Sequence, residues 1–254
     1  MGCLHLFLGL SGEVMPDYEL LLNLALMLLC YAYVLIIIFV SGRMDKILKI
    51  SRKASRKFLH AMIGNLPFII PFFTYNVFPL NFPFFVAAPF IVLTFLASPY
   101  SPFKNFTERF RELADITEEG HRLGLVFYAV SYTFLALFFA SKPYIIATGV
   151  LPMAYGDAAA SAVGERWGKR RYRLFAGKSF EGSAAMFLVT FTSLGVSAVY
   201  FSMFYALSMF GNIFVLLFVA FVAAVAEGFS PLGFDNLTVP FFSVLAFLYF
   251  GGGF

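Results

Sequence analysis

The segment from Met153 to Ser183 holds the residues best suited to chemistry, because an acid, several glycines and a lysine interrupt otherwise apolar sequence there. Asp157 falls late in an apolar run, where an ionised side chain costs roughly 2.5–3.5 kcal/mol on insertion scales and is usually functional. Ser161 and Gly164 follow on a neighbouring stripe of the expected helix. A carboxylate in that position suits Mg²⁺, which prefers oxygen ligands and commonly bridges to substrate phosphates. We therefore predict that Asp157 is catalytic and binds a metal ion.

The basic stretch that follows is typical of a phosphate-binding loop. It contains Gly164, Gly168 and Gly177, and it ends with Lys178 and Ser179 directly before the next apolar run. Backbone amides, a helix dipole and an ammonium group can converge on an anion at such a point. The Walker A pattern is absent, so this would be a different kind of phosphate site. We predict that Lys178 is catalytic and also contacts the nucleotide.

The same glycines have an alternative role in helix packing. Gly156, Ala160 and Gly164 form a ridge of small residues at four-residue spacing. Such ridges let two helices approach closely in a bilayer. From the sequence alone, Gly156 and Gly164 could either pack two helices together or contact the nucleotide, and both roles stay open.

Two further polar segments carry candidate residues. Arg52, Arg56, His60 and Gly64 recur every four residues, so on a helix they line one stripe. An arginine there could hold phosphate, and an imidazole is the usual proton carrier near neutral pH, so we predict that Arg56 binds the nucleotide and that His60 is catalytic. The alternative is that these positive charges only attract anionic lipid and set topology.

The last polar segment is an acidic turn near the end of the chain. Glu227 and Asp235 flank a Gly and Pro turn between two apolar runs. A carboxylate close to an apolar span is costly, so we predict that both residues join Asp157 in the metal site. The alternatives are that the two carboxylates hold the sugar hydroxyls of a nucleotide, or that this is an ordinary acidic turn at a helix end.

Composition indicates an all-α, polytopic integral membrane protein. Hydrophobic residues make up 61% of the 254 residues, charged residues make up 13%, and 36 residues are Phe. At roughly 20 apolar residues per crossing, about seven or eight transmembrane helices fit, and we expect a single transmembrane catalytic domain, 1–254, with no nucleic-acid partner. Apolar runs occur at 18–41, 58–75, 77–97, 122–140, 143–164, 182–206, 211–228 and 238–254. Prolines in the second and third runs predict kinked or broken helices.

Charge placement predicts the orientation in the membrane. The chain has seven Lys or Arg in 43–57, four in 104–122 and six in 166–178. With eight spans and the N-terminus outside, these loops and the loop 229–237 all face the cytoplasm, as the positive-inside rule requires. In a prokaryote the membrane would be the cell membrane. Residues 1–17 form an N-terminal segment, and we suspect that the natural start is Met15.

Four motifs in order resemble the dolichol kinase and phytol kinase family of polyprenol kinases. They are Arg56-Lys57-x-x-His60, Gly156-Asp157-Ala-Ala-Ala-Ser161-x-x-Gly164-x-x-x-Gly168, Lys178-Ser179-x-Glu181-Gly182-Ser183, and Glu227 with Asp235-Asn236-Leu-Thr-Val-Pro240. The resemblance covers about residues 52–240. It implies a multi-span enzyme that phosphorylates a long isoprenoid alcohol at the cytoplasmic face, with CTP as the usual donor and a divalent metal such as Mg²⁺. It also implies nucleotide contacts in the segment from Gly156 to Ser183, which includes Ser161, Glu181 and Gly182.

Two alternatives come from other functional classes. A CTP-dependent cytidylyltransferase that makes a CDP-activated lipid would need the same membrane, nucleotide and Mg²⁺, but its acids would normally be paired rather than single. An ion-coupled transporter could use the same intramembrane acids, although polar motifs on one face argue against alternating access. Chain length of the alcohol, nucleotide choice and oligomeric state are not predictable from the sequence.

Overall fold

The computed structural model describes residues 16–49, 51–103, 123–173, 175–206, 213–231 and 233–250. These parts of the chain are mainly helical, which confirms the predicted class of fold. They also contain two short antiparallel hairpins, so the all-α prediction was too simple. β1 (Asn76–Val77) pairs with β2 (Leu80–Asn81), and β3 (Arg171–Arg173) pairs with β4 (Gly177–Ser179). The segment 104–122, with His121 and Arg122, lies outside the described residues, as does Met15.

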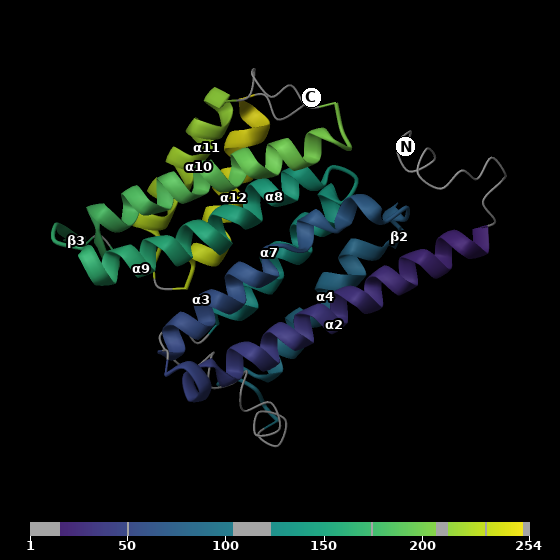
Figure 1. The fold of residues 1–254 in the computed structure, drawn as a ribbon, viewed down its shortest axis with the longest axis horizontal. Coiled ribbons are helices and arrows are strands. Elements are labelled where there is room, and N and C mark those ends of the chain that lie inside the picture. Colours follow the sequence, from purple (N-terminus) through teal and green to yellow (C-terminus); the bar gives the residue numbers. More distant parts are fainter. Residues whose placement is uncertain are drawn as a thin grey trace.

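The eight predicted apolar runs each contain helix in the described structure. The helical elements are α2 (Pro16–Leu48), α3 (Arg52–Ile63), η1 (Leu66–Phe68), η2 (Ile70–Phe72), α4 (Phe82–Leu96), α7 (Gly124–Phe139), α8 (Pro143–Leu151), η3 (Pro152–Gly156), α9 (Asp157–Trp167), α10 (Phe180–Ser202), α11 (Ile213–Phe229) and α12 (Asp235–Tyr249). Successive long elements run back and forth along the bundle (Figure 1).

Among the described residues, two helices have the length and composition to cross a membrane. By those criteria Asp17–Met44 and Phe180–Ser202 are candidate spans, and α4, α7, α11 and α12 are shorter apolar helices. Their outer surfaces carry exposed apolar side chains, including Leu28, Phe138 and Phe214. Large exposed apolar surfaces are unusual in water-soluble monomers, so they support a membrane protein. The number of crossings stays a prediction.

Prolines break the second apolar run, as predicted. α3 ends at Ile63, and Pro67 and Pro71 each lie in the first turn of a short 3-10 helix instead of a continuous α-helix. Proline has no amide hydrogen to donate, so it is tolerated in a first turn and disrupts a helix interior. Pro83 likewise lies in the first turn of α4, whereas Pro89 lies inside that helix.

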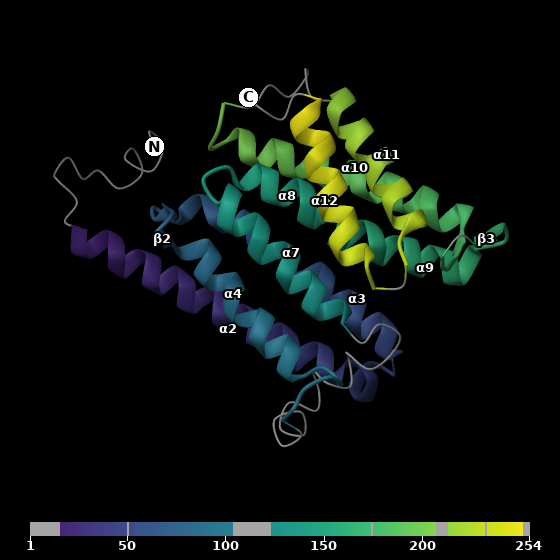
Figure 2. The same ribbon diagram turned by 180° about the vertical axis from the view of Figure 1, so that it is seen from behind.

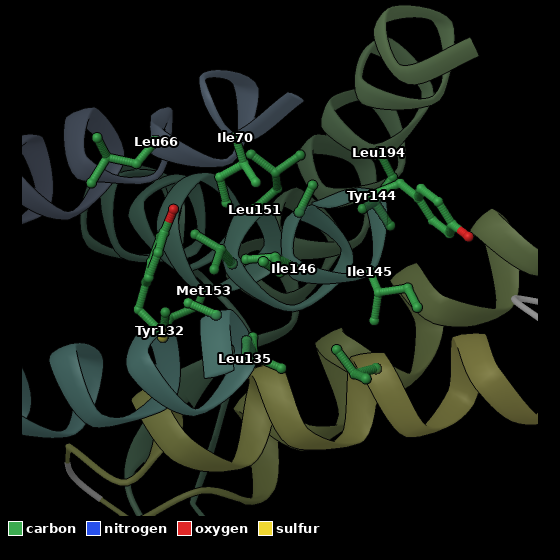
Figure 3. Packing of buried hydrophobic residues seen from close by; sticks show 14 of the residues in the cluster. Leu66, Ile70, Tyr132, Leu135, Tyr144, Ile145, Ile146, Leu151, Met153 and Leu194 are labelled. Atoms are coloured by element: carbon green, nitrogen blue, oxygen red, sulfur yellow. The ribbon is translucent and has the colours of Figure 1, made fainter. Parts of the chain in front are cut away.

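The core is centred on α8, and every residue of this helix is buried. Figure 3 shows Ile145, Ile146 and Leu151 of this region surrounded by side chains from neighbouring helices. α8 continues without a break through the π-helical turn η3 into α9. π-Helical turns of this kind are frequent at functional sites, and this one places Asp157 directly after the buried core helix.

The predicted site elements gather at one end of the bundle. The end of α2, the start of α3, α9 and the β3–β4 hairpin lie there, whereas the start of α2 and the β1–β2 hairpin lie at the opposite end (Figures 1 and 2). Parts of the chain that are far apart in sequence therefore meet at a single polar end.

Candidate active site

A polar pocket of about 270 Å³ lies at this end of the bundle. It is formed by α3, α9, the β3–β4 hairpin, α10 and the ends of α11 and α12. Its charged lining residues are Lys53, Arg56, Lys57, Arg171 and Lys178, together with Asp157, Glu165, Glu227 and Asp235. Ser161, Gly164, Ser179 and Gly182 also line it. Most of the site residues predicted from sequence therefore share one cavity.

The first buried ion pair in the pocket joins Lys57 of α3 to Asp157 at the start of α9. The side chain of Asp157 is only 6% exposed, and that of Lys57 is 14% exposed. Removing a charge from water is costly unless it is paired, so the ammonium group is what makes a buried carboxylate tolerable here. Sequence reasoning gave Lys57 no role of its own, although this residue was part of the first family motif.

The second buried ion pair joins Lys178 of β4 to Glu227 of α11. Glu227 is more deeply buried than its partner, with 3% of its side chain exposed against 20% for Lys178. Burial alone would lower the pKa of Lys178, but Glu227, Asp157 and Asp235 outweigh it, and the net effect raises this pKa above its ordinary value. Lys178 is therefore positively charged across the physiological range of pH.

Asp235 adds a third carboxylate at the first residue of α12, and it is buried. The pocket thus brings together Asp157, Glu227 and Asp235, the three residues that sequence analysis assigned to a metal site. Their oxygens have the hard-ligand chemistry that Mg²⁺ requires, and Mg²⁺ is usually held by one or two carboxylates plus substrate phosphates. Within the described ranges, no three His, Cys, Asp or Glu side chains lie close enough to hold a metal ion by themselves. A metal ion held by Asp157, Glu227 and Asp235 therefore stays a prediction.

The glycines of the second and third motifs pack two helices together. A Cβ atom on Gly164 would lie 3.0 Å from the Ser179 hydroxyl, and one on Gly168 would lie 2.8 Å from it. A Cβ on Gly182 would lie 2.8 Å from the Ala160 carbonyl oxygen. These approaches support the packing alternative, because side chains here would force α9 and α10 apart. Gly164 and Gly182 also line the pocket, whereas Gly168 does not.

The Ser179 hydroxyl has a structural partner. It accepts a hydrogen bond from the Gly182 amide at 3.1 Å and so caps the first turn of α10. The predicted loop is therefore a β-hairpin that leads into a capped helix, with Lys178 one residue before the cap. Gly156 lies outside the pocket lining, and a Cβ there would lie 2.6 Å from the Met186 sulfur of α10, which again indicates close packing.

Tyr172 fixes the hairpin that carries Lys178, a contribution that sequence reasoning missed. The two residues are directly opposite each other in the β3–β4 ladder, so their side chains share a face. The Tyr172 hydroxyl shares a hydrogen bond of 2.7 Å with Ser183. A Cβ on Gly228 would lie 2.7 Å from the same hydroxyl oxygen, so only glycine fits beside Glu227.

Three other predicted nucleotide ligands have mixed outcomes. Arg56 is buried and lines the pocket. Ser161 also lines it and donates a hydrogen bond of 3.0 Å to Glu165. Glu181 lies outside the lining and instead accepts hydrogen bonds from the Arg170 amide at 3.2 and 3.3 Å, which ties the hairpin to α10. The structure therefore gives Glu181 a contact with the hairpin and no place in the pocket wall.

His60 lies behind the pocket wall. It is 2% exposed, does not line the pocket, and packs against the Tyr128 ring with centroids 4.7 Å apart. The Tyr128 hydroxyl donates a hydrogen bond of 3.0 Å to the His60 carbonyl oxygen. The imidazole is close enough to Asp157 to interact with its charge. If His60 carries a proton, its charge would therefore be felt by Asp157.

The fold and the pocket define a helical, membrane-type protein with a pocket of basic and acidic side chains at one polar end. Among curated proteins, the chain is similar to a phytol kinase of Synechocystis sp., with 41% identity over 132 residues. The similarity covers 49% of this chain and 53% of the relative, so the chain spans about half the length of the phytol kinase that it matches. It confirms the resemblance to phytol kinases that the motifs indicated. No family model matches the chain, and no solved structure matches it significantly.

Proposed function

We propose that the protein is a lipid kinase that transfers the γ-phosphate of a nucleoside triphosphate, CTP, to a long-chain isoprenoid alcohol. The observation that carries this proposal is the pairing of Lys57 with Asp157 and of Lys178 with Glu227 in one polar pocket. The 41% identity to a phytol kinase supports the same class of reaction. CTP is proposed from the family resemblance alone.

The ion pairs give the pocket a way to receive a highly charged ligand. Phosphate oxygens entering the pocket compete with Asp157 and Glu227 for the two lysines, and Arg56 and Arg171 add further positive charge. The released carboxylates, with Asp235, are the residues that would hold Mg²⁺. When bound, Mg²⁺ supplies neutralisation of charge at the phosphate oxygens. Little covalent work is left to the protein in phosphoryl transfer, so this positioning and neutralisation dominate catalysis.

The reaction forms one bond and breaks another at the γ-phosphorus. The alcohol oxygen attacks that atom, the bond to the bridging oxygen of the β-phosphate breaks, and the nucleoside diphosphate leaves. The hydroxyl proton goes to Asp157, which lines the pocket, or else to His60, which lies behind the pocket wall and interacts with the charge of Asp157. Lys178 stabilises the charge on the transferring phosphoryl group.

The proposed orientation places this reaction on the cytoplasmic face. The basic segments 43–57 and 166–178 carry 13 Lys or Arg between them and adjoin the pocket end of the bundle. Under the positive-inside rule this end faces the cytoplasm, and eight crossings then leave the N-terminus outside. The polar pocket at one end, instead of the middle of the bundle, disfavours an ion-coupled transporter, whose site would lie near the midplane.

The proposal can be tested by incubating the purified protein with labelled nucleotides and a series of isoprenoid alcohols. Label from the γ-phosphate of CTP in the extracted lipid is the expected result. Label from the α-phosphate or the base would instead identify a cytidylyltransferase. Transfer from ATP in preference to CTP would keep the kinase and overturn the choice of donor.

A further inference from the structure

A second pocket, with about 40 Å³ of free space, lies between α2, α3, α4 and α7. Its walls are apolar apart from three hydroxyl groups, and they include Val34 of α2, Leu59 of α3, Phe90 of α4 and Ala129 of α7. No charged side chain lines it among the residues that the structure describes. Protein interiors are close-packed, so an apolar void of this kind suits an apolar guest better than water.

The two pockets are built on the same helix. Arg56 and Lys57 of α3 line the polar pocket, and Leu59 and Ile63, within the next two turns, line the apolar pocket. His60 lies between them in sequence. An amphiphile with one polar end would therefore cross from one pocket to the other along α3.

Two aromatic side chains, Tyr128 and His60, pack together beside the apolar pocket. Tyr128 lines the apolar pocket and packs on the His60 ring, and His60 in turn interacts with the charge of Asp157. The Tyr128 hydroxyl is engaged with the His60 carbonyl oxygen, and the Thr94 hydroxyl donates to the Phe90 carbonyl oxygen at 2.6 Å. These two hydroxyls are satisfied inside the protein, whereas the third, that of Tyr132, is buried without a hydrogen-bond partner among the described residues.

We propose that the apolar pocket holds the proximal part of the isoprenoid chain, with the alcohol hydroxyl directed past His60 toward Asp157. This inference rests on the proposed kinase function and adds the acceptor site to it. The occupant follows from the position of both pockets on α3 and from their chemistry: a nucleotide finds no charged side chain in the apolar pocket, whereas an isoprenoid alcohol has one polar end and a long apolar chain. The rest of the chain extends toward the bilayer.

Enlarging small residues of this pocket tests the assignment. Ala129 and Ala87 line it and are buried, so Ala129→Leu and Ala87→Leu would fill part of its space. We expect the KM for the isoprenoid alcohol to rise about tenfold or more, since occupation of one side-chain position changes discrimination by that order. The KM for the nucleotide should not change. Ala136→Leu is the matched control, because Ala136 is fully buried on the same helix and lines neither pocket.

A photoreactive isoprenoid alcohol provides a readout that does not depend on turnover or on the variants. A diazirine on its first isoprene unit should label peptides of α2, α3, α4 or α7 in the wild-type protein, since all four helices line the pocket. Labelling confined to other helices, or an unchanged KM for the alcohol in both folded Leu variants, would overturn the acceptor site while leaving the kinase function intact. Labelling by a diazirine phospholipid that the isoprenoid alcohol cannot displace would identify an ordinary lipid site and also overturn it. Failure of the proposed function itself is distinct, because the wild-type protein would then phosphorylate no isoprenoid alcohol.

Discussion

Variants of the Lys178–Glu227 ion pair should separate the stability of the protein from its activity. In Lys178→Met, Glu227 keeps a charge on a side chain that is only 3% exposed and has lost its ion-pair partner. Breaking a buried pair in this way costs about 3–5 kcal/mol. At roughly 2–4 °C per kcal/mol for a chain of this size, the unfolding midpoint should fall by about 6–20 °C.

Removing the other partner should cost less. Lys178 is 20% exposed, so in Glu227→Gln its ammonium group can be hydrated and can still donate to the amide oxygen. We expect a loss of no more than about 2 kcal/mol. The double variant, Lys178→Met with Glu227→Gln, has no buried charge at this position and should regain most of the stability that Lys178→Met loses. It should nevertheless be inactive, because the charge that neutralises the phosphates is gone.

Thermal unfolding of the detergent-purified variants, followed by size-exclusion chromatography, measures the stability, and γ-phosphate transfer measures the activity. The control is Lys53→Met, which breaks an ion pair with Glu165 whose side chains are 49% and 56% exposed. Exposed pairs contribute about 0–1 kcal/mol, so its midpoint should hardly move. A double variant no more stable than Lys178→Met would refute the coupling. A double variant with normal turnover would reduce the pair to a structural role.

The remaining predictions concern single positions around the pocket. Asp157→Asn should lower turnover by about 10² or more while the protein still folds, and a folded variant with normal turnover would contradict both its roles. Gly228→Ala should reduce activity because its Cβ meets the Tyr172 hydroxyl, and Tyr172→Phe in the same chain should restore part of it; no recovery would show that the clash lies elsewhere. Gly156→Ala should cost about 1–3 kcal/mol by forcing η3 from α10, measured as a lower unfolding midpoint. His60→Ala should lower kcat by about 10² to 10⁴ and alter the acidic limb of the pH profile, whereas a change confined to KM with an unchanged profile would exclude the base role.

The helices and their order were predictable because hydropathy alone marks apolar runs. The side chains that reach the pocket were only partly predictable, because helical spacing alone does not decide which basic residues of α3 reach it. Arg56 and Lys57 both face the pocket, whereas Lys49 and Arg52 are exposed, and nothing in a run of seven basic residues distinguishes them. Composition predicts that the segment is charged, and only the packing of α3 decides which charge is buried.

The hairpin and the third motif show a second limit. Strands of three residues, such as β3 and β4, are too short for an alternating pattern to be recognised, so the segment was interpreted as a loop. The sequence correctly placed Lys178 and Ser179 before a helix, since a serine followed by an acid is a helix-start signal. The direction of the Glu181 side chain depends on how that helix joins the hairpin, which is a tertiary contact.

Gly64 allows α3 and η3 to approach closely enough for Lys57 to reach Asp157. A Cβ at this position would lie 2.5 Å from the Ala154 side chain, so α3 can approach η3 only because residue 64 has none. That approach fixes α3 against the segment that ends at Asp157, and Lys57, two turns earlier on α3, thereby reaches the carboxylate. The glycine that ends the basic stripe in the sequence is therefore a spacer between two helices. Its effect on the pocket comes from the distance that it allows between Lys57 and Asp157, and not from any contact with a ligand.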